Sequence, residues 1–426
     1  MSPGRVLEQL YARRRFGIRP GVDRVGMLLD ALGRPDRAFP SLHVVGTNGK
    51  GSTAAFLAAI LTAAGCCTGL FTSPHLTSFT ERFRVDGTSP GELEIGPHLA
   101  SVLEKAPDEA TFFEIVTSLA ALFFSDRKVD IAVMEAGMGG RSDATAALSG
   151  IMTLITPIAL DHCDYLGETL EQIAAEKCGI AGTGTPVVIG RQSPAAARAV
   201  RNALRAVPAG SCIWIDQDVS AAWNRDGTLD YRGITTSLAG LTVGIPGRYQ
   251  LHNASLALTA AEALRSMGYD IPDSALRTGI ATAHWPGRME LIPGVPPLLL
   301  DGAHNPAGAE ALADALQDYR YDRLLTVLGI MADKDAAALC SSLIPVTSAC
   351  YCVTPAVDRA MPDTALAALL QRAGMESRPC GSVAAGIAAA RRDAGSNDLI
   401  LVCGSLFTVG EAKAVLAGAP FEGIRG

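Results

Sequence analysis

Short apolar runs alternate with helical patterns along most of the chain. The apolar runs fit buried strands and lie at 42–45, 68–71, 129–134 and 151–156. The helical patterns lie at 52–64, 112–125, 167–179 and 252–266. Polar clusters follow directly after the strands, which is typical of an open α/β sheet that binds ligands beyond the carboxyl ends of its strands. The pattern therefore predicts an α/β fold with a binding site along one sheet edge.

The alternation restarts near residue 284. Strands are expected at 297–301, 324–329 and 399–403, with helices at 307–320, 363–373, 383–394 and 405–417. The stretch 183–250 is less regular. We therefore expect two α/β domains, at 1–286 and 287–426, joined by a linker near 284–288, which suits a chain of 426 residues.

Composition and charge exclude several other classes of protein. A net charge of -7 gives no basic surface for nucleic acid, and no apolar run is long enough to cross a membrane. The ten cysteines show neither a C-x-x-C pair nor a Cys/His cluster at zinc spacing, so we expect reduced thiols. The first residues are basic and polar, unlike a signal peptide. We therefore expect a cytoplasmic protein with no nucleic-acid or membrane partner.

A glycine-rich loop joins the first strand to the first helix. It reads Gly46-Thr47-Asn48-Gly49-Lys50-Gly51-Ser52-Thr53. Glycines permit a tight backbone path, and the N–H groups at a helix N-terminus suit a phosphate. We expect Lys50 to reach the β- and γ-phosphates of a nucleotide, and Ser52 or Thr53 to place a hydroxyl on Mg²⁺. The alternative is a strand-to-helix turn without a ligand. Gly51 separates Lys50 from Ser52, whereas the ordinary P-loop has Ser or Thr directly after the lysine.

The ends of the next strands carry further candidates. Glu135 follows the strand 129–134, so it is either a carboxylate that holds Mg²⁺ or a surface acid. Asp143, in the glycine-rich loop that follows, either binds substrate or pairs within that loop. His162 follows the strand 151–156 and is a metal ligand, a general base or a polar surface residue.

Lys177 lies on the apolar face of the predicted helix 167–179. A capping box at Thr169 and Gln172 and the stop at Gly179 define this helix. A buried free ammonium is costly unless it is paired or neutralised. Three solutions stay open: a buried ion pair, a long stem that reaches solvent, or a carbamylated lysine whose carboxylate-like end binds Mg²⁺.

Taken in order, these motifs resemble those of the folylpolyglutamate and dihydrofolate synthase branch of the Mur ligase superfamily. The resemblance extends from Gly46 to Ser405 and includes the segments 46–53, 135–143, 161–162, 176–180, 246–254, 286–290 and 301–306. It implies a P-loop NTPase-like Mur ligase central domain and a smaller Rossmann-like C-terminal α/β domain. The chain departs from the family form at Ala136, Met138, Ser142 and Ala146.

The resemblance also implies roles in metal and nucleotide binding. The first of two Mg²⁺ ions is held by Ser52 and Glu135, and the second by Glu135, His162 and a carbamylated Lys177. ATP is bound by the loop 46–53 and by later residues, namely Gln250, Asn253, Arg288, Asp301 and His304. Among these, Arg288 meets the phosphates, and Asp301 and His304 meet the nucleoside. Helix capping is the alternative for Gln250 and Asn253. ATP would then lie between the domains, so catalysis would need domain closure.

By resemblance the chain is an ATP-dependent amide ligase, and the family suggests a monomer. The acceptor carboxylate takes the γ-phosphoryl group, and the amino group of L-glutamate displaces phosphate from the acyl phosphate. Catalysis is assigned to Lys50, His162, Lys177 and Arg288. The acceptor is dihydropteroate or a reduced folate, with candidate contacts at Ser73, Pro74, His75, Arg82, Phe113 and Asp143. Loop structure and core packing are the alternatives for these contacts.

Two other functions stay open. One is a Mur-type ligase that acts on a non-folate carboxylate. The other is a P-loop ATPase switch, which would have no use for the second-domain set Arg288, Asp301 and His304.

Overall fold

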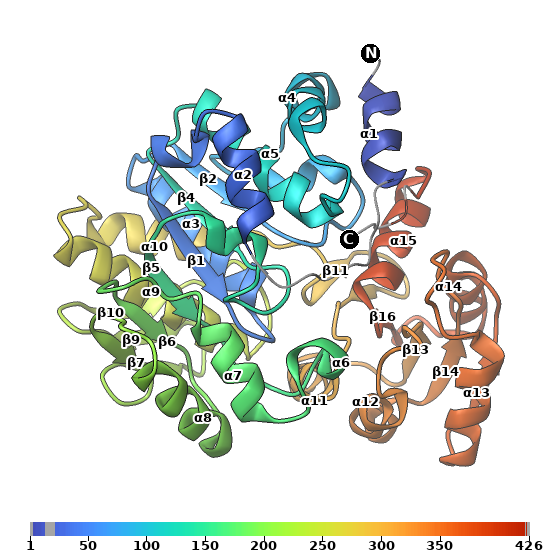
Figure 1. Cartoon of the computed structure of the whole chain (residues 1–426). Helices are drawn as coiled ribbons and strands as arrows, with labels where there is room; N and C mark the ends of the chain where they lie inside the picture. The colour runs from blue at the N-terminus through green and yellow to red at the C-terminus, as the bar shows by residue number, and fades with distance from the viewer. Residues whose placement is uncertain (1–2, 13–21, 422, 424–426) are drawn as a thin grey trace.

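The computed structural model describes residues 3–12, 22–421 and 423. Its largest sheet has the strand order β3-β2-β4-β1-β5-β6-β7, and all neighbours are parallel except β3, which pairs antiparallel with β2 (Figure 1). The strands are β1 (Ser41–Val45), β2 (Thr68–Phe71), β3 (Phe83–Val85), β4 (Ile131–Glu135), β5 (Gly150–Ile155), β6 (Val187–Ile189) and β7 (Cys212–Trp214). The central strands β1 and β4 are buried along their whole length, as expected where helices cover both faces of a sheet.

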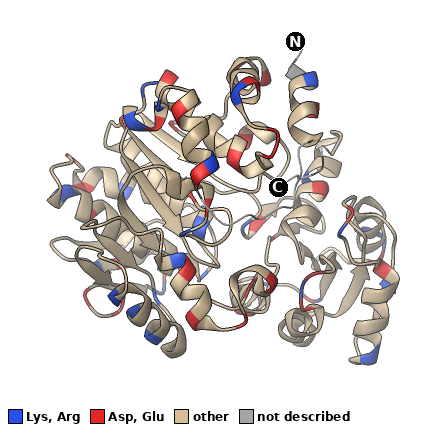
Figure 2. Cartoon of the chain, viewed as in Figure 1, with Lys and Arg blue, Asp and Glu red and all other residues tan. Residues whose placement is uncertain are grey.

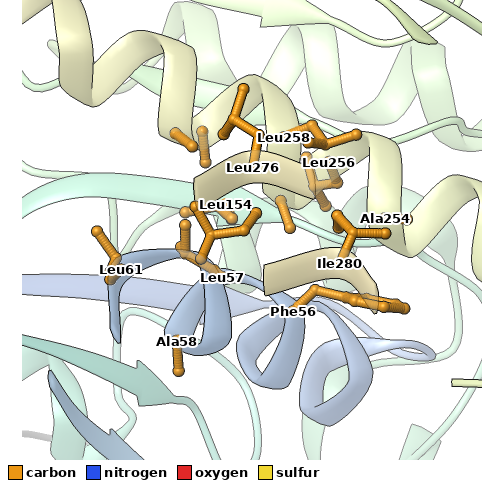
Figure 3. Close-up of a cluster of buried hydrophobic side chains, with 14 of the residues drawn as sticks. Phe56, Leu57, Ala58, Leu61, Leu154, Ala254, Leu256, Leu258, Leu276 and Ile280 are labelled. Carbon is orange, nitrogen blue, oxygen red and sulfur yellow. The ribbon is translucent and has the colours of Figure 1, made fainter. Parts of the chain in front are cut away.

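Three helices cover one face of this sheet. They are α3 (Lys50–Ala63), α9 (Gln250–Ser266) and α10 (Asp273–Thr282). Figure 3 shows their buried side chains meeting Leu154 of β5, and all belong to one continuous apolar cluster. Gly279 lets α10 approach α3 closely, because a Cβ there would lie 2.4 Å from the Cα of Ile60. This close contact joins α10 to the C-terminal half of α3.

The opposite face is covered by helices from the first 205 residues. Their bounds are α1 (Pro3–Ala12), α2 (Asp23–Ala31), α4 (Glu92–Lys105), α5 (Phe112–Asp126), α7 (Leu170–Cys178) and α8 (Pro194–Arg205). Short helical turns complete this part: η1 (Pro35–Ala38), η2 (Phe79–Arg82), η3 (Ala144–Ala147) and α6 (Cys163–Leu166). The predicted helices 112–125 and 167–179 are confirmed as α5 and α7.

The stretch 183–250, which the pattern left irregular, contains β6, α8, β7 and a separate antiparallel sheet. That sheet has the order β10-β9-β8 and consists of β8 (Ser220–Trp223), β9 (Leu229–Arg232) and β10 (Ser237–Leu241). Its strands are short and alternate between buried and exposed positions, which gives a weak signal in sequence. Tyr231 anchors it, since its hydroxyl donates a hydrogen bond to Glu262 of α9 at 2.6 Å.

A third sheet, with the order β11-β12-β16-β13-β14-β15, organises the C-terminal part. Its strands are β11 (Glu290–Ile292), β12 (Leu298–Leu300), β13 (Leu324–Leu328), β14 (Ala349–Cys352), β15 (Ser377–Pro379) and β16 (Leu399–Cys403). One face packs against α11 (Pro306–Ala315), η4 (Leu316–Asp318), α12 (Ala336–Leu343), η5 (Ile344–Val346) and α13 (Asp363–Arg372). The other face packs against α14 (Val383–Asp393) and α15 (Leu406–Ala417). All neighbours are parallel except β11, the antiparallel edge strand.

The predicted α/β fold class is therefore confirmed. Lys and Arg are interspersed with Asp and Glu over both halves of the molecule (Figure 2). Within the described ranges, no helix combines the length and the apolar character needed to cross a membrane. The division at residues 286 and 287 stays a prediction, although the strands of the third sheet begin just after it, at Glu290.

Candidate active site

The glycine-rich loop 46–53 runs from β1 into α3 through backbone conformations that require glycine. Gly46 has φ +147° and Gly49 has φ +87°. A Cβ on Gly49 would lie 2.3 Å from Oδ1 of Asn253, so α9 presses directly on the loop. Gly51 is equally confined, since a Cβ there would lie 2.8 Å from the indole of Trp285. The extra glycine that separates Lys50 from Ser52 therefore makes room for an aromatic side chain.

Gln250 and Asn253 extend from the first turn of α9 to the hydroxyls of the loop. The amide of Gln250 donates to the Ser52 hydroxyl at 3.4 Å, and the Thr53 hydroxyl donates to Oδ1 of Asn253 at 3.5 Å. The two amides also bond to each other at 2.7 Å. The N-cap of α9 is Tyr249, which makes no side-chain capping bond. The helix-capping alternative for Gln250 and Asn253 is therefore wrong.

Two lysines converge on the carbonyl of Gly46. Lys177 Nζ donates to it at 2.8 Å and Lys50 Nζ at 3.3 Å. Lys177 is 4% exposed, and no carboxylate of the described residues forms an ion pair with it. Burial, together with the neighbouring charge of Lys50, lowers the pKa of Lys177 to about 7. The alternatives of an ion pair and of a stem that reaches solvent do not describe this side chain.

Glu135 ends β4 beside the same loop, and it is buried at 4% exposure. One carboxylate oxygen accepts a hydrogen bond from the backbone amide of Ser73 at 3.1 Å. Burial raises the pKa of Glu135 to about 6, against the lowering effect of Lys50 and Arg288. The side chain is therefore no surface acid, and its charge is poorly compensated by the protein alone.

A cleft that opens to solvent joins this edge of the sheet to the C-terminal part. Its walls come from the loop 46–53, the segment after β2, the end of β4, the linker and α15. The lining residues are Gly51, Thr72, Ser73, Pro74, His75, Leu76, Glu81, Arg84, Glu135, Trp285, Pro286, Arg288 and Leu406. Some residues of each predicted set line this cleft, at the carboxyl edge of the sheet: Gly51 and Arg288 for the nucleotide, Glu135 for the metal, and Ser73, Pro74 and His75 for the acceptor.

The remaining predicted acceptor contacts lie behind this cleft. Arg82 is buried at 1% exposure, donates to Nδ1 of His75 at 2.9 Å and lies over the ring of Phe112. Phe113 is half-buried and packs on the loop after β4, because a Cβ on Gly137 would lie 2.6 Å from its ring.

Asp143 lies inside the glycine-rich loop that follows β4. Its carboxylate accepts hydrogen bonds from the amide and hydroxyl of Thr145 and from the amide of Met138. Pairing within the loop therefore describes Asp143 in this structure, as the alternative reading expected.

Asp161 joins the two halves of the molecule. It pairs with Lys334 at 2.5 Å and accepts from the Asn305 amide at 3.2 Å. His162 and His304 lie 3.9 and 3.8 Å from it. Burial opposes ionisation of Asp161, but the two imidazoles and the Lys334 ammonium outweigh it and hold the pKa of Asp161 well below the usual range. Burial lowers the pKa of both histidines to about 4.

A second connection lies beside Asp161. The side-chain amides of Asn48 and Asn305 exchange two hydrogen bonds, at 3.1 and 2.9 Å, between the loop 46–53 and the start of α11. Figure 1 shows α11 next to α6, which follows His162 directly. The start of the predicted nucleotide loop is therefore tied to the C-terminal part.

Asp301 directly follows β12 and is 3% exposed. It accepts from the Tyr249 hydroxyl at 2.9 Å and from the backbone amide of Met289 at 3.0 Å, while Ala303 N donates to its other oxygen. The Arg288 guanidinium lies against Gly302, where a Cβ would be 2.1 Å away. Asp301 thus positions the segment that carries Arg288, and its contact with a nucleoside stays a prediction.

Sequence reasoning assigned no role to Asn305, Lys334, Trp285 or Arg84. Asn305 lies inside the segment 301–306, whereas Lys334 lies in none of the segments named above, and their partner Asp161 is more than 140 residues away along the chain. The contact of Trp285 could have been expected from Gly51, because a glycine where the ordinary P-loop has a hydroxyl residue indicates a close neighbour. Within the described residues, no three His, Cys, Asp or Glu side chains gather at metal distance. The predicted metal set contains two residues of these types, with a hydroxyl and a lysine besides.

Comparisons with known proteins identify the family of this chain. The family model for the Mur ligase middle domain matches residues 44–261, and that for the Mur ligase glutamate ligase domain matches residues 287–406. A Halobacterium salinarum protein named probable bifunctional folylpolyglutamate synthase/dihydropteroate synthase is 39% identical over 94% of this chain. The chain spans about half the length of that relative.

Two solved structures cover the chain almost completely. Escherichia coli FolC in complex with DHPP and ADP has a TM-score of 0.89 and 31% identity, over 98% of both chains. A bifunctional folylpolyglutamate synthase/dihydrofolate synthase with Mn, AMPPNP and L-glutamate bound has a TM-score of 0.87 and 30% identity, also over 98% of both chains. The chain therefore belongs to the folylpolyglutamate synthase/dihydrofolate synthase family of Mur ligases.

Proposed function

We propose that this protein is an ATP-dependent ligase that joins L-glutamate to the carboxylate of dihydropteroate, of a reduced folate, or of both. The observation that carries the proposal is the cleft, which brings the phosphate-type loop, Glu135, Arg288 and the segment 72–76 to one place. Relatives of nearly the same length bind DHPP with ADP, or AMPPNP with L-glutamate. A cytoplasmic location and a monomeric state are further predictions of this proposal.

The residues around the cleft suit the transfer of a phosphoryl group. The N–H groups at the start of α3 and the Lys50 ammonium would bind the phosphates of ATP, with Arg288 approaching from the other half. Gln250 and Asn253 hold the loop hydroxyls in place from behind. The acceptor carboxylate would take the γ-phosphoryl group and the amine of glutamate would displace it, so the protein mainly orients groups and compensates charge.

The oxygen donors fit a divalent cation at one position. Glu135 is a buried carboxylate whose pKa is raised by burial, and Ser52 offers a hydroxyl, which together suit Mg²⁺. Such an ion would neutralise charge on the transferring phosphoryl group. His162 and Lys177 fit a second cation if Lys177 carries a carbamate, because an ammonium is no metal ligand.

Lys177 has the properties that carbamylation needs. Its amine is buried, lacks a carboxylate partner and has a lowered pKa, so a large neutral fraction is available to react with carbon dioxide. Lys177→Ala should abolish ligation while the protein stays folded, and small added carboxylates should restore part of the activity. A carbonyl signal from labelled bicarbonate, present in the wild type and absent in the variant, reports the modification without any assay of activity.

The exposed Lys105→Ala provides a control of the same residue type. Near-native turnover of Lys177→Ala, or an unlabelled wild-type protein, would contradict the carbamate.

The experiment that tests the proposed function measures ADP release and product mass with Mg²⁺-ATP and L-glutamate. A product heavier by one glutamate from dihydropteroate establishes the synthase reaction, and the same gain from tetrahydrofolate establishes the polyglutamate reaction. Failure with both acceptors would refute the folate assignment and leave other carboxylates to screen. ATP turnover that glutamate does not stimulate would favour the ATPase switch.

A further inference from the structure

Arg84 is a cation of the cleft that the proposed mechanism does not use. It lies in β3, the edge strand of the large sheet, and shares the cleft with Glu135 and Arg288. Its guanidinium stacks on the ring of Trp285 at 4.9 Å from the centroid. This stacking, on the same indole that covers Gly51, fixes a long side chain beside the phosphate-type loop.

No acid of the described residues forms an ion pair or hydrogen bond with the guanidinium of Arg84. Glu81 is the acid whose charge acts on the pKa of Arg84, but its carboxylate accepts hydrogen bonds from the backbone amides of Leu76, Thr77 and Ser78. Glu135 in turn accepts from Ser73. A half-buried arginine without a carboxylate partner is costly, and burial lowers the pKa of Arg84 accordingly.

Arginines and glutamates are equal in number in the lining of the cleft, and Lys50 adds positive charge beside Glu135. Arg84 and Arg288 line the cleft, while Glu81, held by amides, and Glu135 are its acids. Arg288 and Lys50 are needed for phosphates in the proposed function. Arg84 is therefore left for a further anion, and a planar guanidinium held on an aromatic face suits a carboxylate.

We propose that Arg84, held by Trp285, binds a carboxylate of the acceptor that does not react. The inference rests on the proposed function. A reduced folate that ends in glutamate reacts through one carboxylate and keeps a second one close by. Dihydropteroate has a single carboxylate, which is consumed in the reaction. Arg84 thus favours acceptors that already carry glutamate, and it contributes nothing specific to the dihydropteroate reaction.

The test compares Arg84→Met with the wild type for both acceptors. Dissociation constants for tetrahydrofolate and dihydropteroate are measured by titration, and KM values are measured for each acceptor that turns over. Loss of one charge-assisted contact should weaken the binding of tetrahydrofolate about 10- to 100-fold. The dissociation constants and KM values for dihydropteroate, ATP and glutamate should change less than about twofold. Arg84→Lys should recover part of the loss, because the charge remains without the planar fork.

Arg201→Met is the matched control. Arg201 also stacks on a tryptophan, Trp214, at 4.0 Å, but it lies on α8 away from the cleft, so neither acceptor should bind differently. Equal weakening of both acceptors by Arg84→Met would overturn the proposal. A rise in the glutamate KM with both acceptors would also overturn it and would assign Arg84 to the incoming amino acid. A wild-type protein that turns over neither acceptor refutes the proposed function instead.

Discussion

His43 lies in the centre of the large sheet, and its burial predicts an acid-sensitive step in stability. The side chain is 2% exposed, and neither ring nitrogen has a hydrogen-bond partner. The ring fits because residue 150 is glycine, where a Cβ would lie 2.7 Å from Nδ1 of His43. A neutral imidazole tolerates this site at some cost, but an imidazolium would be a buried charge without a partner.

Burial lowers the pKa of His43 to about 4, while an unfolded chain titrates near the ordinary histidine value of about 6.5. Between these two values the unfolded state binds more protons, so acidification favours unfolding. The stabilisation is complete above pH 6.5 and is lost progressively as the pH falls toward 4. Integrating from pH 7.5 to pH 5 gives a loss of about 2 kcal/mol from this one side chain.

His43→Leu should remove that loss. The free energy of unfolding is measured by denaturant titration at pH 7.5 and pH 5, with tryptophan fluorescence as the signal, because all three tryptophans lie in residues 1–286 with His43. Other buried histidines titrate in both proteins, so the difference between the two pH slopes isolates His43. The exposed His284→Gln should keep the wild-type slope. Equal slopes for the wild type and His43→Leu would refute the reasoning.

Two further predictions concern the nucleotide loop. Gly49→Ala should weaken ADP binding at least tenfold in titrations, because a Cβ at φ +87° meets a side-chain amide of α9. Gly65→Ala imposes similar backbone strain, but its Cβ would meet no neighbouring atom, so this variant should be less stable and still bind ADP with wild-type affinity. Equal ADP affinities for the two variants would contradict this account. Asn48→Ala removes two hydrogen bonds to Asn305, which together contribute about 2 kcal/mol. The equilibrium between open and closed forms of the nucleotide-bound protein, measured by X-ray scattering, should therefore shift about 30-fold toward the open form. Arg248→Ala, which breaks an exposed ion pair with the C-terminal part, should shift it less than about fivefold, and an equal shift for both would contradict the role of Asn48.

Local sequence patterns were sufficient to predict the elements whose apolar runs, glycines and capping residues lie within a few residues of one another. The strand 42–45, the loop 46–53 and the helix after it combine an apolar run, glycines and a helical period, and the structure has β1 and α3 there. The helix 167–179 was equally clear because of its capping box, and Thr169 and Gln172 do form one.

The stretch 183–250 shows why other elements could not be predicted. Its strands β7 to β10 have three to five residues each, and several of them are half exposed. A run of that length does not distinguish a strand from a loop, and the packing of β9 against α9 that stabilises it is set by a distant segment.

The same argument separates the parts of the candidate site. Glu135 and Lys177 could be singled out because each is a polar residue in an apolar local setting, and the structure buries both. Asp161, Asn305 and Lys334 stand in locally polar loops, so nothing near them in sequence indicates that they meet. Their meeting depends on how the C-terminal sheet is placed against the large one, which is decided by many contacts together. Asp161 is buried where the two halves meet. Its negative charge therefore requires the Lys334 ammonium as a partner when the halves are joined. The pair therefore links the position of the C-terminal part to Asp161, the residue next to His162. A motif within one segment of the sequence cannot reveal such a link, because the two partners lie far apart along the chain.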